Sequence, residues 1–444
     1  MDVLLVRPPR RGATAFFSVM ECEPLELEYL AAACAQRGLS WGIWDGVTET
    51  RPLRAVLETC RPKMVAISGY LPQEEEIRLC AALAKEVCPD CTTVVGGGHA
   101  QRNPERLFWS EVDVVFRGES AEDFAALAAG APPETLDGIC VRKDGIWVQT
   151  PYVPGEISRL PLPDRTLWER ARKRFRYMDL TGLSTMKTAY SCPFSCSFCY
   201  GSGLHGGAYQ ALPVERVLED LENVPGKNIF ITDYDFLLDE TRLNALMDGM
   251  DARGIHKTFV CYARADFIVA HPALMKRLAE HGFLWYAVGI ESVSDGRLTA
   301  WNKGTTTDLN RRCIKALRDL GCTCVGLTIV DLNFTKQDFR ALYQWAKESG
   351  LRYVSAQVLT PIPGTAFYEQ NREKMAGIQA KRFDLAHALL EPEHMTRGAF
   401  MRQYSLLMAR LLWLSWRRGA YRFVTVSYLF SCVSRWIQEK KLLK

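Results

Sequence analysis

Short apolar segments alternate with amphipathic segments along most of this chain of 444 residues, and this alternation restricts the possible folds more than any other feature. In the first 130 residues the apolar segments are VLLVRPP, SWGIWDG, MVAISGY, TTVVGGGHA and VDVVFRGES. Strands separated by helices in this way are typical of a parallel sheet with helices on both faces. We therefore expect an α/β protein whose residues 1–135 form a doubly wound, Rossmann-like sheet of five strands.

The alternation resumes between residues 183 and 370. The strand-like segments there are STMKTAYS, NIFITDYDF, TFVCYARAD, WYAVGIES, CVGLTIVD and YVSAQVLTP. Six βα units are too few for a closed eight-unit barrel, so we expect a partial (β/α)6 barrel of the TIM type. Residues 136–182 are rich in Pro, Arg and turn residues and form a linker with one hairpin at Asp144-Gly145. Residues 371–444 form a C-terminal helical segment.

Small residues follow three strands of the expected first sheet. In a doubly wound sheet, ligands bind beyond the carboxyl ends of the strands, and glycines there let a large flat ligand approach the backbone. The three turns contain Ser68, Gly69 and Tyr70; Gly97, Gly98 and His99; and Gly118 with Glu119. Glycines that only shape tight turns are the alternative interpretation.

The basic charge is concentrated at the C-terminus. Residues 401–444 hold nine Lys or Arg against the single acid Glu439, a net charge of +8; the whole chain carries +4, which leaves −4 for the rest. Arginines interrupt the apolar runs before they reach the roughly 20 residues that a spanning helix needs. Trp413 and Trp416 among these arginines suit a helix in the lipid headgroup region, so we expect peripheral contact with the inner face of a membrane. A helix packed on the barrel with an arginine-rich outer face is the alternative.

Composition limits the compartment and the partners. The chain has 48% hydrophobic and 24% charged residues, which excludes a disordered protein. Fifteen cysteines, an odd number scattered through apolar segments, indicate a reducing compartment. The first residues, MDVLLVRPPRR, carry their charges after the apolar run and resemble a strand rather than a signal peptide. We expect a cytoplasmic protein. Outside the C-terminal tail the sequence has no basic patch interleaved with aromatic residues, so nucleic acid is not an expected partner.

Three cysteines stand close together in SCPFSCSFCY, at Cys192, Cys196 and Cys199, and no fourth follows at a matching distance. A structural zinc site uses four protein ligands, usually in two separated pairs. A 4Fe-4S cluster normally takes four thiolates, so three of them leave one iron for another ligand. The loop follows the first strand of the expected barrel, at the face where barrel enzymes hold their chemistry. A metal-storage or accidental grouping is the alternative.

The order CxxxCxxC, with aromatic residues on both sides of the third cysteine, resembles the signature of the radical S-adenosylmethionine superfamily. The resemblance implies that Cys192, Cys196 and Cys199 hold a 4Fe-4S cluster whose fourth iron binds S-adenosylmethionine. It also implies cofactor-binding roles for Phe198, Tyr200, Arg264 in YARAD, Glu291 in GIES, and Asp233 or Asp235 in ITDYDF, which replaces the usual GGE-like turn.

The segments GIESVSDGRLTAWNKGTTTD, IKALRDLGCTCVGLTIV and QVLTPIPGTAFYEQ are similar to the subgroup that carries an N-terminal cobalamin-binding domain. The turns at Gly97-Gly98-His99 and Gly118-Glu119 match the GGxH and GE turns of that domain. The DxHxxG motif that supplies a lower axial histidine in many cobalamin proteins is absent, and His99 lies on a different turn. The usual glycine-proline turn after the fifth barrel strand is replaced by VDLNFTKQD. The resemblance implies cobalamin as a third cofactor, with a cobalamin-free enzyme as the alternative.

The same resemblance implies a reaction. In the family, reductive cleavage of S-adenosylmethionine gives a 5′-deoxyadenosyl radical that removes hydrogen from an unactivated carbon. We predict a cobalamin-dependent C-methyltransferase that acts on a hydrophobic metabolite or lipid and takes electrons from a reductant such as flavodoxin or ferredoxin. The alternatives are a cyclisation, oxidation or rearrangement without methyl transfer, and an iron-sulfur electron-transfer or scaffold protein.

Two further cysteines lie in expected barrel strands, Cys261 and Cys324. A thiol that lines the barrel cavity can serve as a hydrogen donor or an acid, so both are candidate catalytic residues. Ordinary core packing is the alternative for each.

Overall fold

The computed structural model describes residues 1–10, 19–425, 428, 442 and 443. It divides into two compact units: Met1–Phe175 with the described part of Val424–Lys444, and Arg176–Phe423. Each unit is described by itself below. Within the described residues, no helix is both long enough and apolar enough to cross a bilayer.

The first unit is built on a seven-stranded sheet with the order β3-β1-β4-β5-β6-β7-β8. Its strands are β1 (Val3–Arg7), β3 (Trp41–Asp45), β4 (Met64–Ser68), β5 (Thr92–Gly96), β6 (Val114–Phe116), β7 (Ile139–Lys143) and β8 (Ile146–Gln149). The first five pair in parallel, in the order of a doubly wound sheet, which confirms the predicted fold class.

The hairpin at Asp144-Gly145 belongs to this sheet. Both turn residues have positive φ, 49° and 82°, as a tight hairpin turn requires. We assigned the hairpin to the linker, but β7 pairs antiparallel with β6 and extends the sheet. The local turn signal predicted the hairpin and carried no information about which strand it would join.

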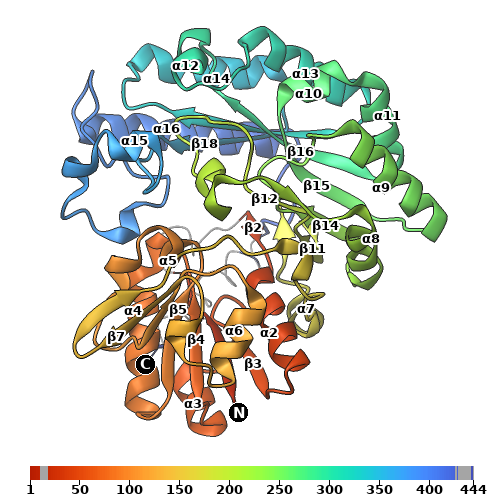
Figure 1. Cartoon of the computed structure of the whole chain (residues 1–444). Coiled ribbons are helices and arrows are strands. Elements are labelled where there is room, and N and C mark those ends of the chain that lie inside the picture. The colour runs from red at the N-terminus through yellow and green to blue at the C-terminus, as the bar shows by residue number, and fades with distance from the viewer. Residues whose placement is uncertain (11–18, 426–427, 429–441, 444) are drawn as a thin grey trace. The chain divides into compact units, whose positions relative to one another are not determined.

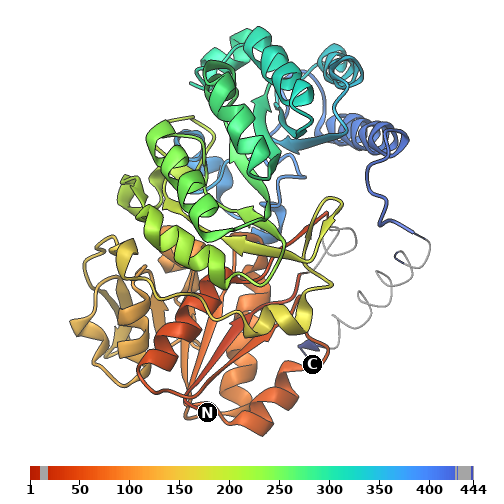
Figure 2. The same cartoon turned by 90° about the vertical axis from the view of Figure 1, so that its right-hand side faces the viewer.

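Helices cover both faces of the first sheet (Figure 2). They are α2 (Leu25–Gln36), α3 (Leu53–Cys60), α4 (Glu74–Val87), α5 (Gly98–Arg102), α6 (Ala121–Ala128) and the short α7 (Thr166–Ala171). Because side chains alternate along a strand, Leu4 and Val6 of β1 enter the core under α3 and α4, whereas Val3 and Leu5 enter the core under α2 and α6. Two buried layers therefore hold the carboxyl ends of the strands at a fixed edge.

The second unit contains a six-stranded sheet in which all neighbours are parallel. The strands in their order are β11 (Leu183–Met186), β14 (Asn228–Ile231), β15 (Thr258–Ala263), β16 (Phe283–Glu291), β17 (Thr323–Val330) and β18 (Tyr353–Val358). The order follows the chain, as in a barrel that has not closed. This agrees with the predicted partial (β/α)6 architecture.

Helices connect successive strands and cover one face of this sheet (Figure 1). They are α8 (Val214–Asn223), α9 (Glu240–Arg253), α10 (Ala265–Ala270), α11 (Pro272–Glu280), α12 (Asp295–Ala300), α13 (Thr307–Asp319) and α14 (Lys336–Ser349). The short α15 (Ala366–Glu369) follows the last strand. Short strands complete the chain: β2 (Met20–Glu21), β9 (Arg176–Tyr177), β10 (Leu180–Thr181), β12 (Ala189–Tyr190) and β13 (Gln210–Ala211).

The last described helix, α16 (Arg397–Arg417), packs on α14 and β18. Phe400, Tyr404, Leu407 and Leu411 form its buried stripe, and the Tyr404 hydroxyl donates to the carbonyl of Ala356 at 3.1 Å. The predicted packing of a C-terminal helix on the barrel is present over this span. Beyond residue 425, the predicted helical tail lies outside the described residues except at positions 428, 442 and 443.

Candidate active site

The three cysteines of the predicted cluster site lie on one loop of the second unit. The loop begins after β12 and ends before β13, and the antiparallel pair of these two strands closes its base. We expected the loop to follow the first barrel strand directly, but that segment is divided into β11 and β12. Cys192, Cys196 and Cys199 are each half-buried on this loop.

Burial controls the protonation of the loop thiols. It raises the pKa of Cys192 above its ordinary value and that of Cys199 to about 11. The charges of Cys196 and Cys192 add to the rise of the pKa at Cys199. Each thiol must lose its proton to bind iron, so cluster assembly at this loop releases protons.

The described residues contain no group of three His, Cys, Asp or Glu side chains gathered tightly enough to hold a single metal ion. Thiolates that hold a four-iron cluster bind separate irons and stand further apart than the ligands of one ion. Three cysteine thiols on one loop are a donor set of the kind that iron-sulfur clusters use.

Side chains from two other segments hold the cysteine loop. The Arg264 guanidinium lies over the ring of Phe194 at 3.8 Å, and the Trp301 ring meets the Phe198 ring edge-on at 5.7 Å. The Asn302 side-chain amide donates to the carbonyl and the hydroxyl of Ser195 at 3.2 and 3.0 Å. Neither Trp301 nor Asn302 was predicted as a site residue, although both belong to a segment on which the family resemblance rests.

The two candidate aspartates after β14 have different surroundings. Asp233 accepts hydrogen bonds from the backbone amides of Thr188 and Ala189 at 2.7 and 3.0 Å. These bonds take two amides out of regular strand pairing, which explains why the segment before the cysteines is divided. Asp233 is therefore committed to holding the base of the loop.

Asp235 is buried, and within the described part of the chain no group donates a hydrogen bond to either of its carboxylate oxygens. The backbone amide of Leu237 favours its ionised form without reaching hydrogen-bond geometry. Burial raises the pKa of Asp235 to about 7, against the opposing charges of Arg264 and Lys303. An unsatisfied buried carboxylate is costly for the fold and is therefore a candidate for binding a cationic ligand.

Arg264 and Glu291, two further predicted cofactor residues, stand at the ends of neighbouring strands. Arg264 pairs with Asp266 at 2.8 Å and donates to the carbonyl of Lys303 at 2.8 Å. Glu291 ends β16 and forms a buried ion pair with Lys303, with 2.9 Å between Oε1 and Nζ. Lys303 was missed by the sequence analysis, because nothing local distinguishes a buried lysine from a solvated one.

Phe198 and Tyr200 flank the third cysteine. Phe198 packs against a small apolar cluster of Trp301, Ile329 and Leu359. Tyr200 is partly exposed and its ring meets that of Tyr234 edge-on at 5.8 Å. The two aromatic residues therefore lie in different environments on the two sides of the loop.

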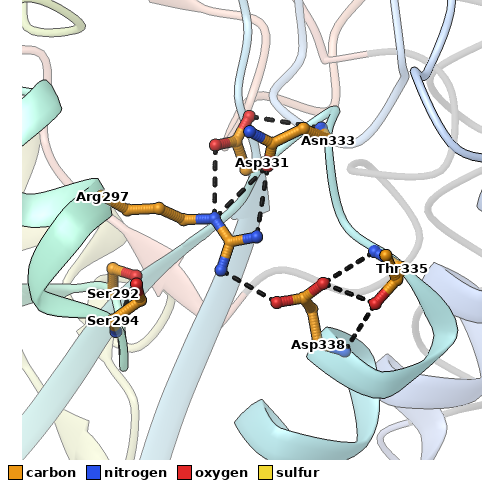
Figure 3. A network of polar contacts seen from close by, with 7 residues as sticks. All are labelled: Ser292, Ser294, Arg297, Asp331, Asn333, Thr335 and Asp338. Carbon is orange, nitrogen blue, oxygen red and sulfur yellow. Dashed lines mark hydrogen bonds and ion pairs between the residues drawn. The ribbon is translucent and has the colours of Figure 1, made fainter.

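The turn that replaces the usual glycine-proline turn is held by one arginine (Figure 3). Arg297 of α12 reaches Asp331 at 3.5 Å and Asn333 at 3.2 Å after β17, and Asp338 of α14 at 2.9 Å. Asp338 also accepts from the amide and hydroxyl of Thr335, which cap α14. This network fixes the turn by ion pairing where a glycine-proline pair would fix it by backbone restriction.

Cys261 and Cys324 lie in the core of the second unit. Strand register places Cys261, Tyr286 and Cys324 in one row across β15, β16 and β17. Burial raises the pKa of Cys324 well above its ordinary value, and the charge of Cys313 on α13 adds to the rise, so Cys324 faces the helix layer. Burial raises the pKa of Cys261 in the same way. The catalytic role of these thiols remains a prediction that their position does not favour.

In the first unit, the predicted ligand turns meet at one edge of the sheet. Ser68 ends β4, and Gly97 and Gly118 follow the adjacent strands β5 and β6. Gly97 has a φ of 90°, and a Cβ there would lie 2.7 Å from the Ser68 hydroxyl. Only glycine lets these two turns approach so closely.

The other predicted residues of this edge differ in exposure. Gly69 and Gly98 continue the turns, and Tyr70 is exposed. His99 is buried with Nε2 at 3.1 Å from Glu74, while its Nδ1 has no partner among the described residues. Glu119 accepts from Gln101 and from the Tyr152 hydroxyl. The edge therefore offers backbone and a few fixed polar groups, as a site for a large ligand does.

The class of protein follows from this fold and from two family models. The model "Radical SAM superfamily" matches residues 186–346, and the model "B12 binding domain" matches residues 18–128. The chain therefore carries a radical SAM domain and, before it, a B12-binding domain. The radical SAM domain implies a 4Fe-4S cluster and S-adenosylmethionine, and the B12-binding domain implies cobalamin.

Individual relatives refine this assignment. The chain is 28% identical over 407 residues to the hopanoid C-3 methylase of Methylococcus capsulatus, covering 88% of this chain and 76% of the relative. It is 25% identical over 386 residues to an uncharacterized methyltransferase of Pyrococcus horikoshii, covering 83% of each. It is 22% identical over 369 residues to the anaerobic magnesium-protoporphyrin IX monomethyl ester cyclase of Rubrivivax gelatinosus, covering 79% of this chain and 65% of the relative.

Solved structures show the same fold. The cobalamin-dependent radical enzyme OxsB matches with a TM-score of 0.70 at 17% identity, over 99% of this chain and 71% of that one. The methyltransferase TsrM from Kitasatospora setae matches with a TM-score of 0.68 at 17% identity, over 85% of this chain and 78% of that one. The fold of this chain matches both neighbours, which supports the predicted architecture.

Proposed function

We propose that this radical SAM enzyme is a cobalamin-dependent C-methylase whose substrate is a hydrophobic metabolite of the polycyclic lipid class. The carrying observation is the alignment with a hopanoid C-3 methylase over 88% of the chain, through both the cobalamin-binding and the radical SAM regions. Unactivated carbons of such lipids have no acidic proton and no leaving group. A radical route therefore provides the chemistry that general acid-base catalysis does not.

Several residues of the second unit would each bind a different part of S-adenosylmethionine. When bound beside the cluster, this cofactor would supply hydrogen-abstracting radical chemistry, with electrons from a reductant such as flavodoxin or ferredoxin. Asp235 would accept a hydrogen bond from the amino group, because its carboxylate is buried and has no hydrogen-bond donor among the described residues. Arg264 would meet the carboxylate, and Glu291 and Phe198 would hold the nucleoside.

The three turns of the first unit would hold cobalamin. Gly97 and Gly98 present backbone without side chains, and the amide-rich edge suits a large flat ring. His99 would not serve as an axial ligand through Nε2, since that nitrogen is taken by Glu74. Cobalamin would then bind without Nε2 of His99 as a ligand.

The test uses anaerobically reconstituted enzyme with S-adenosylmethionine that carries a trideuterated methyl group. We expect 5′-deoxyadenosine and a lipid product that contains the labelled methyl when hopanoid or other polycyclic lipid extracts are supplied. Deoxyadenosine formed without labelled product, across all lipids and with cobalamin bound, would contradict methylation of this class.

A ring-forming or oxidising reaction is the second candidate, and one relative favours it. The anaerobic magnesium-protoporphyrin cyclase aligns with 79% of this chain at 22% identity. The same labelled incubation separates the two functions, because a cyclase forms product without taking up the methyl group. Supplying a porphyrin ester in parallel with the lipid extract tests both substrates under one set of conditions.

The outer face of α16 supports contact with a lipid surface. Trp413 and Trp416 are 52% and 65% exposed, and Leu406 and Leu412 lie exposed beside them. The helix holds four arginines and no acidic residue, and Arg417 lies over the Trp413 ring at 4.9 Å. Exposed tryptophan and leucine with positive charge complement an anionic bilayer, where an enzyme for lipid substrates would meet them.

Vesicle sedimentation tests this contact. We expect the full chain to bind vesicles of anionic phospholipid, and the variant Trp413→Ala/Trp416→Ala to bind several-fold more weakly. Ile146→Ala is the control, because Ile146 on β8 is 70% exposed and lies on the other unit. Equal binding of both variants, or none by the intact chain, would rule out this surface.

A further inference from the structure

Lys303 is a buried lysine beside the cysteine loop to which no role has so far been given. It is 7% exposed, and its ammonium pairs with the Glu291 carboxylate at 2.9 Å. Its backbone carbonyl accepts from the Arg264 guanidinium at 2.8 Å. A lysine is buried in this way only when a partner offsets the loss of hydration, so the pair is a specific arrangement of the fold.

The backbone around Glu291 is shaped to make the pair. Glu291 has a φ of 57°, a left-handed conformation that is rare outside glycine, and the strand register shifts between Gly289 and Glu291. A Cβ at Gly289 would lie 2.3 Å from the Glu291 carboxylate oxygen and 2.5 Å from Nζ of Lys303. The strand therefore has a bulge where the two charges meet, and Gly289 has no side chain that would fill this space.

The residues next to Lys303 connect it to the cysteine loop. The Ser197 amide donates to the Trp301 carbonyl at 3.1 Å, and Asn302 donates to Ser195. Ser195 and Ser197 stand on either side of Cys196. The segment that carries the ammonium is thus hydrogen-bonded to the loop on both sides of one predicted cluster ligand.

The negative charge of that ligand acts on Lys303. Burial alone disfavours the ammonium, but the negative charges of Glu291 and Cys196 raise the pKa of Lys303 above its ordinary value. The lysine therefore remains charged in the folded protein. A fixed positive charge in a site with little water acts over a longer range than one in solvent.

We propose that Lys303 sets the reduction potential of the iron-sulfur cluster, with Glu291 as the charge that balances it. The proposal rests on the proposed cluster site at Cys192, Cys196 and Cys199. Reduction adds one negative charge to the cluster, and a buried ammonium nearby stabilises that charge. The potential of such clusters depends on net charge, hydrogen bonds and burial, and here the charge is set by a pair whose two members can be removed separately.

The test is a charge cycle on the full chain, reconstituted anaerobically and titrated electrochemically without S-adenosylmethionine. The reduced cluster is followed by electron paramagnetic resonance. Lys303→Met leaves Glu291 unbalanced, so the midpoint potential is expected to become more negative. Glu291→Gln leaves the ammonium unbalanced, so the potential is expected to become less negative. The double variant restores a neutral pair and is expected to return close to the parent value.

Two controls separate charge from structure. Lys303→Arg keeps the charge and is expected to stay near the parent potential. Lys315→Met removes an exposed lysine that pairs with Asp319 on α13, and is expected to leave the potential unchanged. If Lys303→Met fails to assemble a cluster, the midpoint potentials of Glu291→Gln and the double variant are compared instead. These two proteins differ only in the charge of Lys303, and neither has an unpaired buried carboxylate.

The outcomes distinguish this inference from the proposed function. Equal potentials in the parent and all variants, at equal iron content, would overturn the role of Lys303 and leave the enzyme assignment intact. A shift of the same sign in both single variants would also overturn it, because a general loosening of the site moves both alike. A parent chain that takes up no cluster would remove the proposed function and this inference together.

Discussion

The carboxylate of Asp235 lies in the protein interior, and no group in the described residues donates a hydrogen bond to it. This arrangement destabilises the folded protein. Its neighbour Asp233 has the same chemistry and three fixed donors, counting the Thr188 hydroxyl. Removing the charge of Asp235 should therefore relieve the folded state, while removing Asp233 should disturb the base of the cysteine loop. Residues whose removal stabilises a fold are often retained for function.

We predict that Asp235→Asn stabilises the protein at pH 8 and not at pH 4. Between pH 4 and pH 7 the unfolded chain has lost the proton that folded Asp235 retains, so stability falls as pH rises through this window. The difference above pH 7 is about 4 kcal/mol at most. Thermal unfolding of both proteins at the two pH values measures it.

The exposed Asp90→Asn variant is the matched control, and should show no pH-dependent gain. The same Asp235→Asn protein should bind S-adenosylmethionine more weakly, because an amide oxygen attracts an ammonium less than a carboxylate does. Loss of stability at pH 8, or unchanged affinity, would contradict the assignment.

Cys196→Ala should abolish cluster assembly and 5′-deoxyadenosine formation, because two thiolates do not hold a four-iron cluster at this loop. The first unit should stay folded, since its core is separate from the loop. Iron analysis, product analysis and circular dichroism measure the three effects. Cys60→Ala, at a half-buried cysteine of the first unit, should retain iron and activity; iron retained by the Cys196 variant would refute the cluster site.

Among the elements, the segment Trp301–Gly304 has a larger role than its length suggests. It contributes a ring to Phe198, a carbonyl to Ser197 and a side-chain amide to Ser195. Asn302 has a φ of 51°, a conformation that asparagine tolerates better than most residues. The segment therefore orders the cysteine loop before any iron is present.

We predict that Asn302→Asp slows cluster assembly. The substitution keeps the size and backbone preference of the residue, removes the hydrogen bond to the Ser195 carbonyl, worth about 1 kcal/mol, and sets a carboxylate against that carbonyl oxygen. Iron uptake followed by absorbance during anaerobic reconstitution measures the rate. Asn223→Asp on α8, which removes a side-chain donor to the Glu219 carbonyl far along the chain, should not change it. Equal uptake rates would show that the loop orders itself.

The sequence predicted the elements of this site better than the contacts between them. Alternation of apolar segments indicated both sheets, and the spacing of Cys192, Cys196 and Cys199 indicated the loop. Lys303 and Asn302 were not predicted as site residues because their partners are distant in the chain, and only the fold brings them together. Asp233 and Asp235 could not be distinguished, since only burial and hydrogen bonding separate two identical side chains.

At the scale of the whole molecule, each of the two units has its own sheet and buried core. We propose that the first unit, close to the predicted 1–135 domain, binds cobalamin and that the second, which contains the predicted 183–370 barrel, binds the cluster. A ligand that binds the folded state stabilises the part of the chain that forms its site. The two cofactors should therefore protect different segments.

We predict that hydroxocobalamin, added to the full chain, slows hydrogen exchange at residues 64–70, 92–99 and 114–119. Gly97→Ala should abolish this protection, because its Cβ would stand 2.7 Å from the Ser68 hydroxyl at a positive φ. Gly38→Ala is the control, since Gly38 has a φ of 72° with nothing within 4 Å of its Cβ. Protection that survives in Gly97→Ala, or falls equally in Gly38→Ala, would place cobalamin elsewhere.

The missing side chain at Gly289 gives a rule for reading other sequences of this kind. Any larger residue at that position would occupy the space where Glu291 and Lys303 meet. Lineages that replace the glycine should therefore also have lost one or both charges, so that the three positions covary. Such a lineage would be expected to use an electron donor with a different reduction potential.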